Sequence, residues 1–327
     1  MSSRPHSLAD ACERFRDAMR DEGIETPDPI DLDGEFRRIH VEGDRPGTRN
    51  GWYVGYFDSV PAGAFGYWRR GIKATWCARD WRTITDVERE QVRKRTEQAK
   101  ADRSRALAAQ AEKRRSQLNR TWGESVPLDH PDAEPVLRYL DQRLGGHNLD
   151  PWPKALRCRL NLPYYETAKG GRKVGEYPSM IAMVTGPTGV PVTLHRTYLE
   201  PDGTGKATVP SPKKIMGVPF PKTITGAAIR LCEPAERLAV AEGIETASSV
   251  YVATQEPVWA AISAHGLASV VIPATVREVL IYADCDESGV GQRAGEILRL
   301  RLQAEGRTVS LFIPPEPGDF NDELLRE

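Results

Sequence analysis

Carboxylates follow two apolar runs in the last third of the chain, at positions where buried strands would end. The run LAVAEG ends at Glu242, and the run VREVLIYADCD ends at Asp284 and Asp286. Because open α/β sheets bind ligands beyond the carboxyl ends of their strands, we expect these three side chains to converge. Clustered carboxylates of this kind suit Mg²⁺ or Mn²⁺ shared with phosphate groups. The pattern therefore predicts a metal site for phosphate chemistry.

A third acidic segment, PGDFND, follows an expected strand over 309–313. It offers Asp319 and Asp322 as further metal ligands, although Asp often follows a strand only to cap the next helix. We expect one of the two to cap the final helix.

The elements that would position these acids alternate between strand and helix from residue 238 to the end, as in βαβ units. Upstream, PSMIAMV and PVTLHRTYL flank the turn GPTG and predict a β-hairpin. A helix is expected around 134–144, followed by a loop that contains Pro and Trp.

The first 120 residues have a different pattern. Ser7 is placed to cap a helix over 7–19, and short β-type runs fill 36–81. Residues 85–117 lack Gly and Pro and open with a capping box from Thr85 to Glu88. Their charged composition predicts one long, mostly solvated helix that connects two modules.

The motifs EGIETA, YADCDESG and PGDFND, in this order and spacing, resemble the Toprim domain over residues 233–327. The upstream segments YPSMIAMV, HRTYLEPDGTGKA and PKKIMG resemble the region before Toprim in phage- and plasmid-type primases, from about Leu137. The resemblance implies that Glu242 assists proton transfer or metal binding. It also implies that Asp284 and Asp286 hold metals that contact nucleotide phosphates.

The resemblance therefore implies a DNA primase that makes RNA primers on single-stranded DNA from ribonucleoside triphosphates. The expected fold is α/β, with a C-terminal Toprim domain whose Rossmann-like sheet is mostly parallel. An α+β primase-type subdomain, a long charged helix and a small β-rich N-terminal module precede it. The expected boundaries are 1–82, 83–121, 122–232 and 233–327.

Basic residues must balance the nucleotide triphosphate. We expect this role for the Lys and Arg nearest in sequence to the acids, namely Arg196, Lys206, Lys213 and Lys214. His195 is interpreted as a satisfied hairpin residue, because no second His or Cys stands near it at metal spacing.

The N-terminal β-rich module contains aromatic residues interleaved with arginines. Trp52, Tyr53 and Trp68 are candidates for stacking on single-stranded bases. Most rings of this module should form its core, since a small β module needs aromatic mass to be stable.

Composition limits the function classes. The net charge of -1 means that nucleic-acid binding must come from local clusters of Lys and Arg. Five scattered cysteines without a C-x-x-C pair argue against a zinc site and a disulfide framework. No apolar run could cross a membrane and the first residues lack a secretory signal, so a cytoplasmic protein is expected.

The chain departs from bacterial replicative primases, because neither a zinc-binding module nor a helicase-interacting domain is visible. No G-x-x-x-x-G-K-[ST] motif occurs, so a separate helicase is the expected partner. The same acids would also serve a Toprim nuclease that activates water, which is the nearest rival. A topoisomerase is disfavoured because the chain has little room for the large domain that carries its tyrosine. A non-catalytic nucleic-acid-binding replication adaptor is the alternative from another class.

Overall fold

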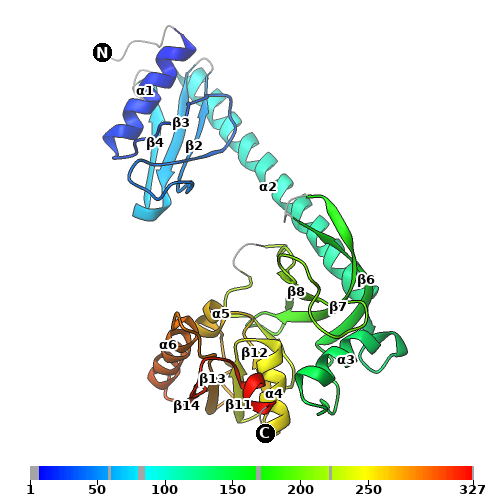
Figure 1. Cartoon of the computed structure of the whole chain (residues 1–327). Coiled ribbons are helices and arrows are strands. Elements are labelled where there is room, and N and C mark those ends of the chain that lie inside the picture. The colour runs from blue at the N-terminus through cyan, green and yellow to red at the C-terminus, as the bar shows by residue number, and fades with distance from the viewer. Residues whose placement is uncertain (1–6, 58–59, 80–84, 167–170, 221–222, 326–327) are drawn as a thin grey trace. The chain divides into compact units, whose positions relative to one another are not determined.

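The computed structural model describes residues 7–57, 60–79, 85–166, 171–220 and 223–325. The chain divides into two compact units, unit 1 (Met1–Ala106) and unit 2 (Leu107–Glu327), which Figure 1 draws in blue to cyan and in green to red. Helix α2 (Asp86–Gly123) supplies residues to both units. Within the described ranges, no helix combines the length and the apolar character that a membrane span requires.

Unit 1 contains a four-stranded antiparallel sheet in the order β1-β2-β3-β4. Its strands are β1 (Arg37–Ile39), β2 (Gly51–Tyr56), β3 (Ala62–Tyr67) and β4 (Ile72–Cys77). Helix α1 (Leu8–Asp21) is capped by Ser7, whose hydroxyl accepts a hydrogen bond from the Asp10 amide. Both the cap and the β-rich character of this region are as the sequence predicted.

Helix α2 extends six residues beyond its predicted end at 117 and stops at Gly123, the first glycine after residue 85. Most of its described side chains are exposed, as expected for a charged helix. The predicted capping box includes the side chain of Glu88, which lies outside the described part of the structure.

Unit 2 is built on one mixed sheet in the order β14-β13-β11-β12-β10-β7-β6-β5, with β8 paired to β7 and β9 paired to β8. The antiparallel strands are β5 (Val126–Pro127), β6 (Leu156–Tyr165), β7 (Lys173–Thr185), β8 (Pro191–Tyr198), β9 (Lys213–Ile215) and β10 (Ala228–Arg230). The parallel strands are β11 (Arg237–Ala241), β12 (Val258–Ala260), β13 (Glu278–Tyr282) and β14 (Thr308–Phe312).

The parallel and antiparallel halves meet at β10, which pairs antiparallel with both β12 and β7. The hairpin β7–β8 is the one that the sequence predicted, whereas β6 was not predicted. The fold is thus mixed α/β with a parallel C-terminal sheet, as expected. The domain boundaries at 82, 121 and 232 stay predictions.

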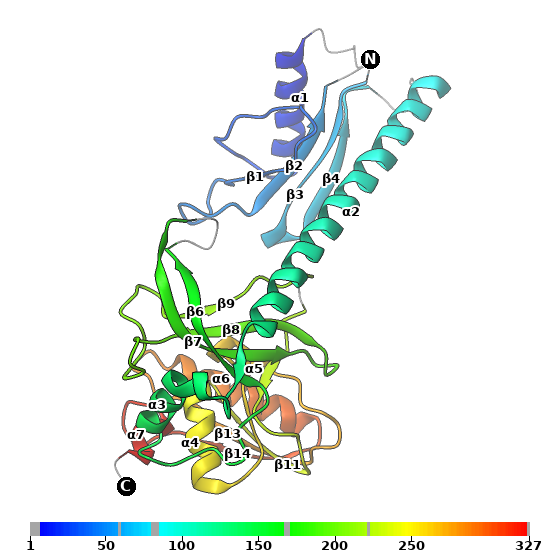
Figure 2. The same ribbon diagram turned by 90° about the vertical axis from the view of Figure 1, so that its right-hand side faces the viewer.

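Helices cover both faces of the parallel half (Figure 2). Alternate residues of β11 show this, because Ala239 and Ala241 pack into the core with α3 and α4, while Leu238 and Val240 pack with α5 and α6. The helices of unit 2 are α3 (Glu134–Arg143), α4 (Ile244–Thr254), α5 (Ala264–Ser269), α6 (Val290–Ala304) and α7 (Phe320–Leu324). The carboxyl ends of the parallel strands remain available for a site.

Candidate active site

Glu242 and Asp284 follow the adjacent parallel strands β11 and β13, which are in register from Arg237 with Glu278 to Ala241 with Tyr282. Burial raises the pKa of Asp284 to about 7, and repulsion from Glu242 and Asp319 adds to the rise. Burial likewise raises the pKa of Glu242. These acids therefore share a partly buried space in which their charges repel one another.

Asp286 has a different environment, because its oxygens accept hydrogen bonds at the start of α6. The Ser288 hydroxyl donates a hydrogen bond to Oδ1, Val290 N–H donates to Oδ1 over 3.1 Å, and Gly291 N–H donates to Oδ2 over 2.9 Å. These bonds hold the pKa of Asp286 at about 2. Asp286 still lies close enough to Glu242 to raise its pKa. It is an ionised carboxylate beside two that resist ionisation.

Asp319 and Asp322 form a capping box on α7. Oδ1 of Asp319 accepts from the amides of Asn321 and Asp322 at 2.8 and 3.1 Å, and Asp322 Oδ2 accepts from the Asp319 amide at 3.2 Å. Only one cap was expected, but both residues take part. Asp319 also raises the pKa of Asp284, so it faces the acidic pair.

Two loops are joined directly at this point. Cys285 and Gly318 exchange two backbone hydrogen bonds of 2.9 Å, which hold the PGDFND segment against the segment containing Asp284 and Asp286. A side chain at Gly318 would meet Asp322, since a Cβ there would lie 2.9 Å from Asp322 Oδ2 at a φ of +149°. Glycine is therefore required where the two acidic segments meet.

Glu245, in the first turn of α4, was not predicted as a site residue. Its side chain is 4 % exposed and lies 3.3 Å from Lys206 Nζ and 3.0 Å from Lys213 Nζ. Tyr139 donates a hydrogen bond to Glu245 Oε1 over 2.7 Å. Burial alone would raise the pKa of Glu245, but the two lysines and this hydrogen bond hold it well below its usual range. Its place in EGIETA, three residues after Glu242, was the available signal.

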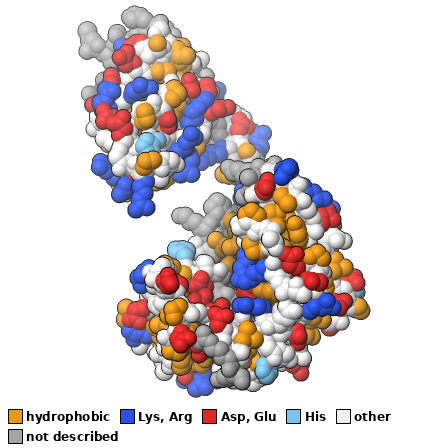
Figure 3. All heavy atoms as spheres, in the orientation of Figure 1, with side chains coloured by type: hydrophobic (Ala, Val, Ile, Leu, Met, Phe, Trp, Pro, Cys, Tyr) orange, Lys and Arg blue, Asp and Glu red, His pale blue; other side chains and the backbone are white. Residues whose placement is uncertain are grey.

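Three of the four predicted basic residues lie in the β8–β9 ladder, and its pleat separates them. Lys213 pairs with Thr197, and Lys214 pairs with Arg196, so these two pairs project from opposite faces. Lys206 and Lys213 contact Glu245, and Lys213 also lowers the pKa of Asp284. The structure thus brings this pair to the acids. Figure 3 shows Lys or Arg side chains beside Asp or Glu side chains on one face of unit 2.

Lys214 and Arg196 make contacts on the other face. Lys214 Nζ donates to the carbonyl of Tyr165 over 2.6 Å and lies 3.7 Å above the Tyr164 ring. Arg196 donates to the Tyr198 hydroxyl over 3.1 Å, and burial lowers its pKa. A nucleotide-binding role for these two stays a prediction.

His195 lies in the hairpin as expected, but the hydrogen-bonding capacity of its ring is not satisfied. Its Nδ1 is buried without a hydrogen-bond partner among the described residues. Burial and the nearby charge of Lys213 lower the pKa of His195 to about 4, so the ring is neutral at pH 7.

Arg143 and Asn321 are two further residues that the sequence analysis missed. Arg143 approaches Asp319 at 3.9 Å, and its Nε is buried without a hydrogen-bond partner among the described residues. The fully buried Asn321 donates to Ser249 Oγ over 3.0 Å and to the carbonyl of Arg143. Asn321 therefore ties α7 to α3 and α4, and fixes the position of Asp319. Only the PGDFND motif itself pointed to Asn321.

The donor set suits Mg²⁺ chemically. No group of three or more His, Cys, Asp or Glu in the described ranges forms a ready cage for a metal ion. Mg²⁺ usually takes one or two carboxylates together with water and substrate phosphates, so a preformed cage is not required. The raised pKa values of Glu242 and Asp284 mark carboxylates that lack enough positive charge around them. A divalent cation would supply it.

The three candidates for base stacking in unit 1, Trp52, Tyr53 and Trp68, do not share one environment, because the side chains of Trp52 and Tyr53 lie on opposite faces of the sheet. Trp68 is 50 % exposed and Trp52 is half-buried. Tyr53 is fully buried, and its hydroxyl accepts from the Asp31 amide over 2.9 Å, so its assignment as a stacking residue is wrong. Tyr53 lies on the face of the sheet that α1 covers, which the period of two along β2 dictates.

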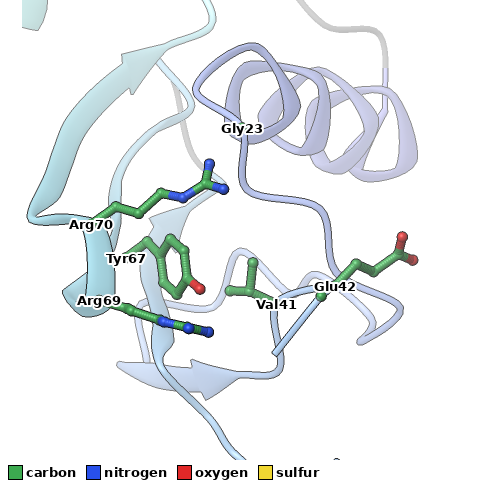
Figure 4. Close-up of a pocket in the computed structure, with 7 residues that line it drawn as sticks. Gly23, Val41, Glu42, Tyr67, Arg69 and Arg70 are labelled. Atoms are coloured by element: carbon green, nitrogen blue, oxygen red, sulfur yellow. The ribbon is translucent and has the colours of Figure 1, made fainter. Parts of the chain in front are cut away.

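Unit 1 also has a cavity of about 330 Å³ beside Tyr67, Arg69 and Arg70 (Figure 4). Arg69 donates to Asp44 Oδ1 over 2.9 Å, and Tyr67 donates to the same oxygen over 2.7 Å. Hydrogen bonds from Tyr67, Asn50 and Arg69 hold the pKa of Asp44 at about 2. The charge of Arg69 is therefore already balanced by the protein.

Comparison with known proteins agrees with the arrangement in unit 2. Residues 237–327 match the family model described as "Toprim domain", and residues 112–226 match one described as "Domain of unknown function (DUF7146)". The chain is similar to two Escherichia coli proteins named "DNA primase TraC", at 29 % identity over 125 residues and 30 % over 130 residues. These matches span 36 % and 38 % of this chain, but only 8 % and 12 % of those much longer proteins.

Two solved primase structures overlap with this chain only in part. The primase fragment of the bacteriophage T7 primase-helicase has a TM-score of 0.34 at 16 % identity, covering 57 % of this chain and 65 % of that one. The DnaG catalytic core has a TM-score of 0.44 at 13 % identity, covering 68 % and 76 %. On the family match and the sequence similarity, this chain carries a C-terminal Toprim domain and is related to the TraC DNA primases.

Proposed function

We propose that the chain is a DNA primase that makes short RNA primers on a single-stranded DNA template, with Mg²⁺ or Mn²⁺, during replication of a phage, plasmid or mobile element. One observation carries the proposal: the carboxyls of Glu242 and Asp284 have raised pKa values, and near them stands Lys213, one of two lysines that Glu245 contacts. The similarity to the TraC primases supports it. A separate helicase as partner remains an expectation.

The acids divide the work according to their environments. Asp284 and Asp286 would hold the metal, with Asp319 next to them. Once bound there, Mg²⁺ or Mn²⁺ would orient the reacting oxygens and offset the charge that develops on the phosphates. Asp284 would be occupied by the metal, which leaves Glu242 as the proton acceptor, and its raised pKa makes it a better acceptor than an ordinary glutamate.

The basic side suits a nucleoside triphosphate. Lys206 and Lys213 are 33 % and 41 % exposed, and each holds a fixed position through Glu245. Their ammonium groups can contact phosphate oxygens while Glu245 keeps them ionised next to each other. Arg143 adds a third positive charge beside Asp319.

The reaction then follows from these positions. The 3′ hydroxyl oxygen of one nucleotide attacks the α-phosphorus of the next, a P–O bond forms, and the bond to pyrophosphate breaks. Glu242 accepts the hydroxyl proton at its carboxylate, and Lys206 and Lys213 stabilise the charge of the departing pyrophosphate.

The test is primer synthesis from labelled ribonucleotides on single-stranded DNA with Mg²⁺ or Mn²⁺. Asp284→Ala/Asp286→Ala should lower synthesis more than about 100-fold, since the metal loses its ligands. Glu287→Ala, which removes an exposed carboxylate from the same loop, is the matched control and should retain synthesis.

Other outcomes would assign other functions. Metal-dependent template cleavage without synthesis, lost in the same double variant, would replace the proposal by a Toprim nuclease. Neither synthesis nor cleavage by the native chain would favour a non-catalytic adaptor.

A further inference from the structure

Helix α1 covers one face of the unit 1 sheet (Figure 2), and we call the other face, which α1 leaves uncovered, its open face. Phe15 of α1 packs edge-on against Tyr53, Phe65 and Trp76, with ring centroids 5.3 to 5.8 Å apart. The alternate residues of the same strands point away from α1, and Trp52 is among them. The open face is therefore a second surface of unit 1, separate from its core.

Three aromatic rings gather on this open side, and we call them the aromatic platform: Phe36, Trp52 and Trp68. Phe36 stacks on Trp52 with centroids 5.6 Å apart and an interplanar angle of 20°. Trp52 and Trp68 are 6.2 Å apart. Phe36 is 42 % exposed and Trp68 is 50 % exposed. Adjacent aromatic rings that stay this exposed mark an interaction surface rather than a core.

Small residues of the neighbouring strand β3 make room for Trp52. Trp52 and Val54 face Gly66 and Ala64 of β3 in the ladder, so small residues lie opposite them. A Cβ at Gly66 would lie 2.7 Å from the Trp52 indole and 2.4 Å from the carbonyl oxygen of Ile72. Glycine at this position therefore allows the indole to lie over β3.

Positive charge lies against the same rings. The guanidinium of Arg38 is 4.8 Å from the Trp68 ring centroid, and that of Arg103 is 5.1 Å from the Phe36 centroid. The exposed Lys73 pairs with Gly66 in the ladder, which places it in the same row as Trp52. Among the described residues, neither Arg38 nor Arg103 forms an ion pair with a carboxylate. Their charge is available to a ligand.

We propose that the aromatic platform binds single-stranded DNA, with bases stacked on Phe36, Trp52 and Trp68 and phosphates contacted by Arg38, Lys73 and Arg103. Stacked rings flanked by cations that form no ion pair among the described residues match the alternation of bases and phosphates in a single strand. An apolar protein partner would leave these cations buried without counter-charges. The proposal adds a template site to the proposed function, at a place separate from the acidic residues.

The platform is tested by fluorescence anisotropy of a labelled oligo-dT strand with the full chain in EDTA. Phe36→Ala/Trp68→Ala should weaken binding at least ~10-fold, since each stacked base contributes about 1–3 kcal/mol. Phe57→Ala is the matched control, because Phe57 is 41 % exposed in the same unit but outside the platform, and it should bind like the native chain. Equal affinity of the double variant and the native chain, with unchanged circular dichroism, would overturn the proposal.

A second measurement tests the cations. Arg38→Gln/Arg103→Gln should reduce the slope of log affinity against log salt concentration by about 1.4, because each phosphate contact in a single strand contributes about 0.7. An unchanged slope would overturn the phosphate contacts. A platform variant that changes the sedimentation of the chain without changing its DNA affinity would show a surface for a second copy instead.

These outcomes are independent of catalysis, because EDTA removes the metal. Oligo-dT binding that depends on the platform in a chain that makes no primers would support this inference and reject the proposed function. If the chain makes primers but the platform variants bind oligo-dT like the native chain, the proposed function would be supported and this inference rejected.

Discussion

The region around Glu245 and the region around Asp284 both bury carboxylates in unit 2, but they balance the charge differently. Glu245 has two lysines within 3.3 Å and a hydrogen bond from Tyr139, and its pKa lies well below the usual range. Asp284 has Glu242 and Asp319 as its main charged neighbours, and its pKa is raised to about 7.

This difference indicates that the Glu245 region has a structural role, whereas the Asp284 region is a binding site. A buried charge is costly unless the protein pairs it, so Glu245 can be ionised in the free protein and can position Lys206 and Lys213. Around Asp284 the chain leaves the balance incomplete, and a cation from solution would complete it. Substitutions in the two regions should therefore change stability in opposite directions.

The largest effect is expected for Glu245→Gln. It leaves Lys206 and Lys213 next to each other without their counter-charge and should lower the free energy of unfolding by about 3 kcal/mol. Urea denaturation at pH 7 followed by circular dichroism measures it. Glu296→Gln is the control, because it removes an exposed partner of Arg299 on α6 and should change little. A Glu245→Gln protein as stable as the native one would mean that this carboxylate does not hold the lysines.

Asp284→Asn should have the opposite sign. The folded pKa of about 7 exceeds the ordinary 3.8, so the folded protein binds more protons than the unfolded chain between these values. The stability that the protonated Asp284 carboxyl contributes at pH 4 is therefore lost as the pH rises to 7 and above. In EDTA at pH 8, Asp284→Asn should be more stable than the native chain by about 1–3 kcal/mol, and the gain should vanish near pH 4.

A bound metal ion should make the native chain more stable than Asp284→Asn. Saturating Mn²⁺ should raise the melting temperature of the native chain at pH 8 and leave Asp284→Asn nearly unchanged. Asp286→Ala serves as the contrast, because it removes the acceptor for the Val290 and Gly291 amides at the start of α6 and should destabilise the chain in EDTA. If Asp284→Asn is the less stable protein in EDTA at pH 8, the protein itself already compensates the negative charge of Asp284.

Much of this site could be predicted because strand ends follow from local patterns. Apolar runs that stop at Glu242 and Asp284 place both at the carboxyl edge of a parallel sheet, whichever helices intervene. The N-cap Ser7, the β7–β8 hairpin and the long charged helix followed from local signals in the same way.

Other features depend on strand pairing, which a single sequence does not reveal. Lys213 and Lys214 are adjacent in sequence, yet they project from opposite faces because β9 pairs with β8 in one register. Tyr53 and Trp52 are divided between core and open face for the same reason. The link through β10 also joins segments 43 residues apart, Thr185 to Ala228, and leaves no local signal.

The smallest effect should come from Lys213, the residue that connects the two regions. It contacts Glu245 and also lowers the pKa of Glu242 and Asp284, whereas Lys206 is not among the groups that shift these two pKa values. A carboxylate must lose its proton to bind metal, so Mn²⁺ affinity should rise with pH. In Lys213→Met, the pH of half-maximal affinity should increase by less than about 1 unit, since one charge in a partly solvated site contributes about 1 kcal/mol. Lys206→Met should leave that pH unchanged in isothermal titration calorimetry, although it removes the same charge from Glu245. Equal shifts in the two variants would mean that the lysines act through Glu245 alone and that the two regions are not linked by Lys213.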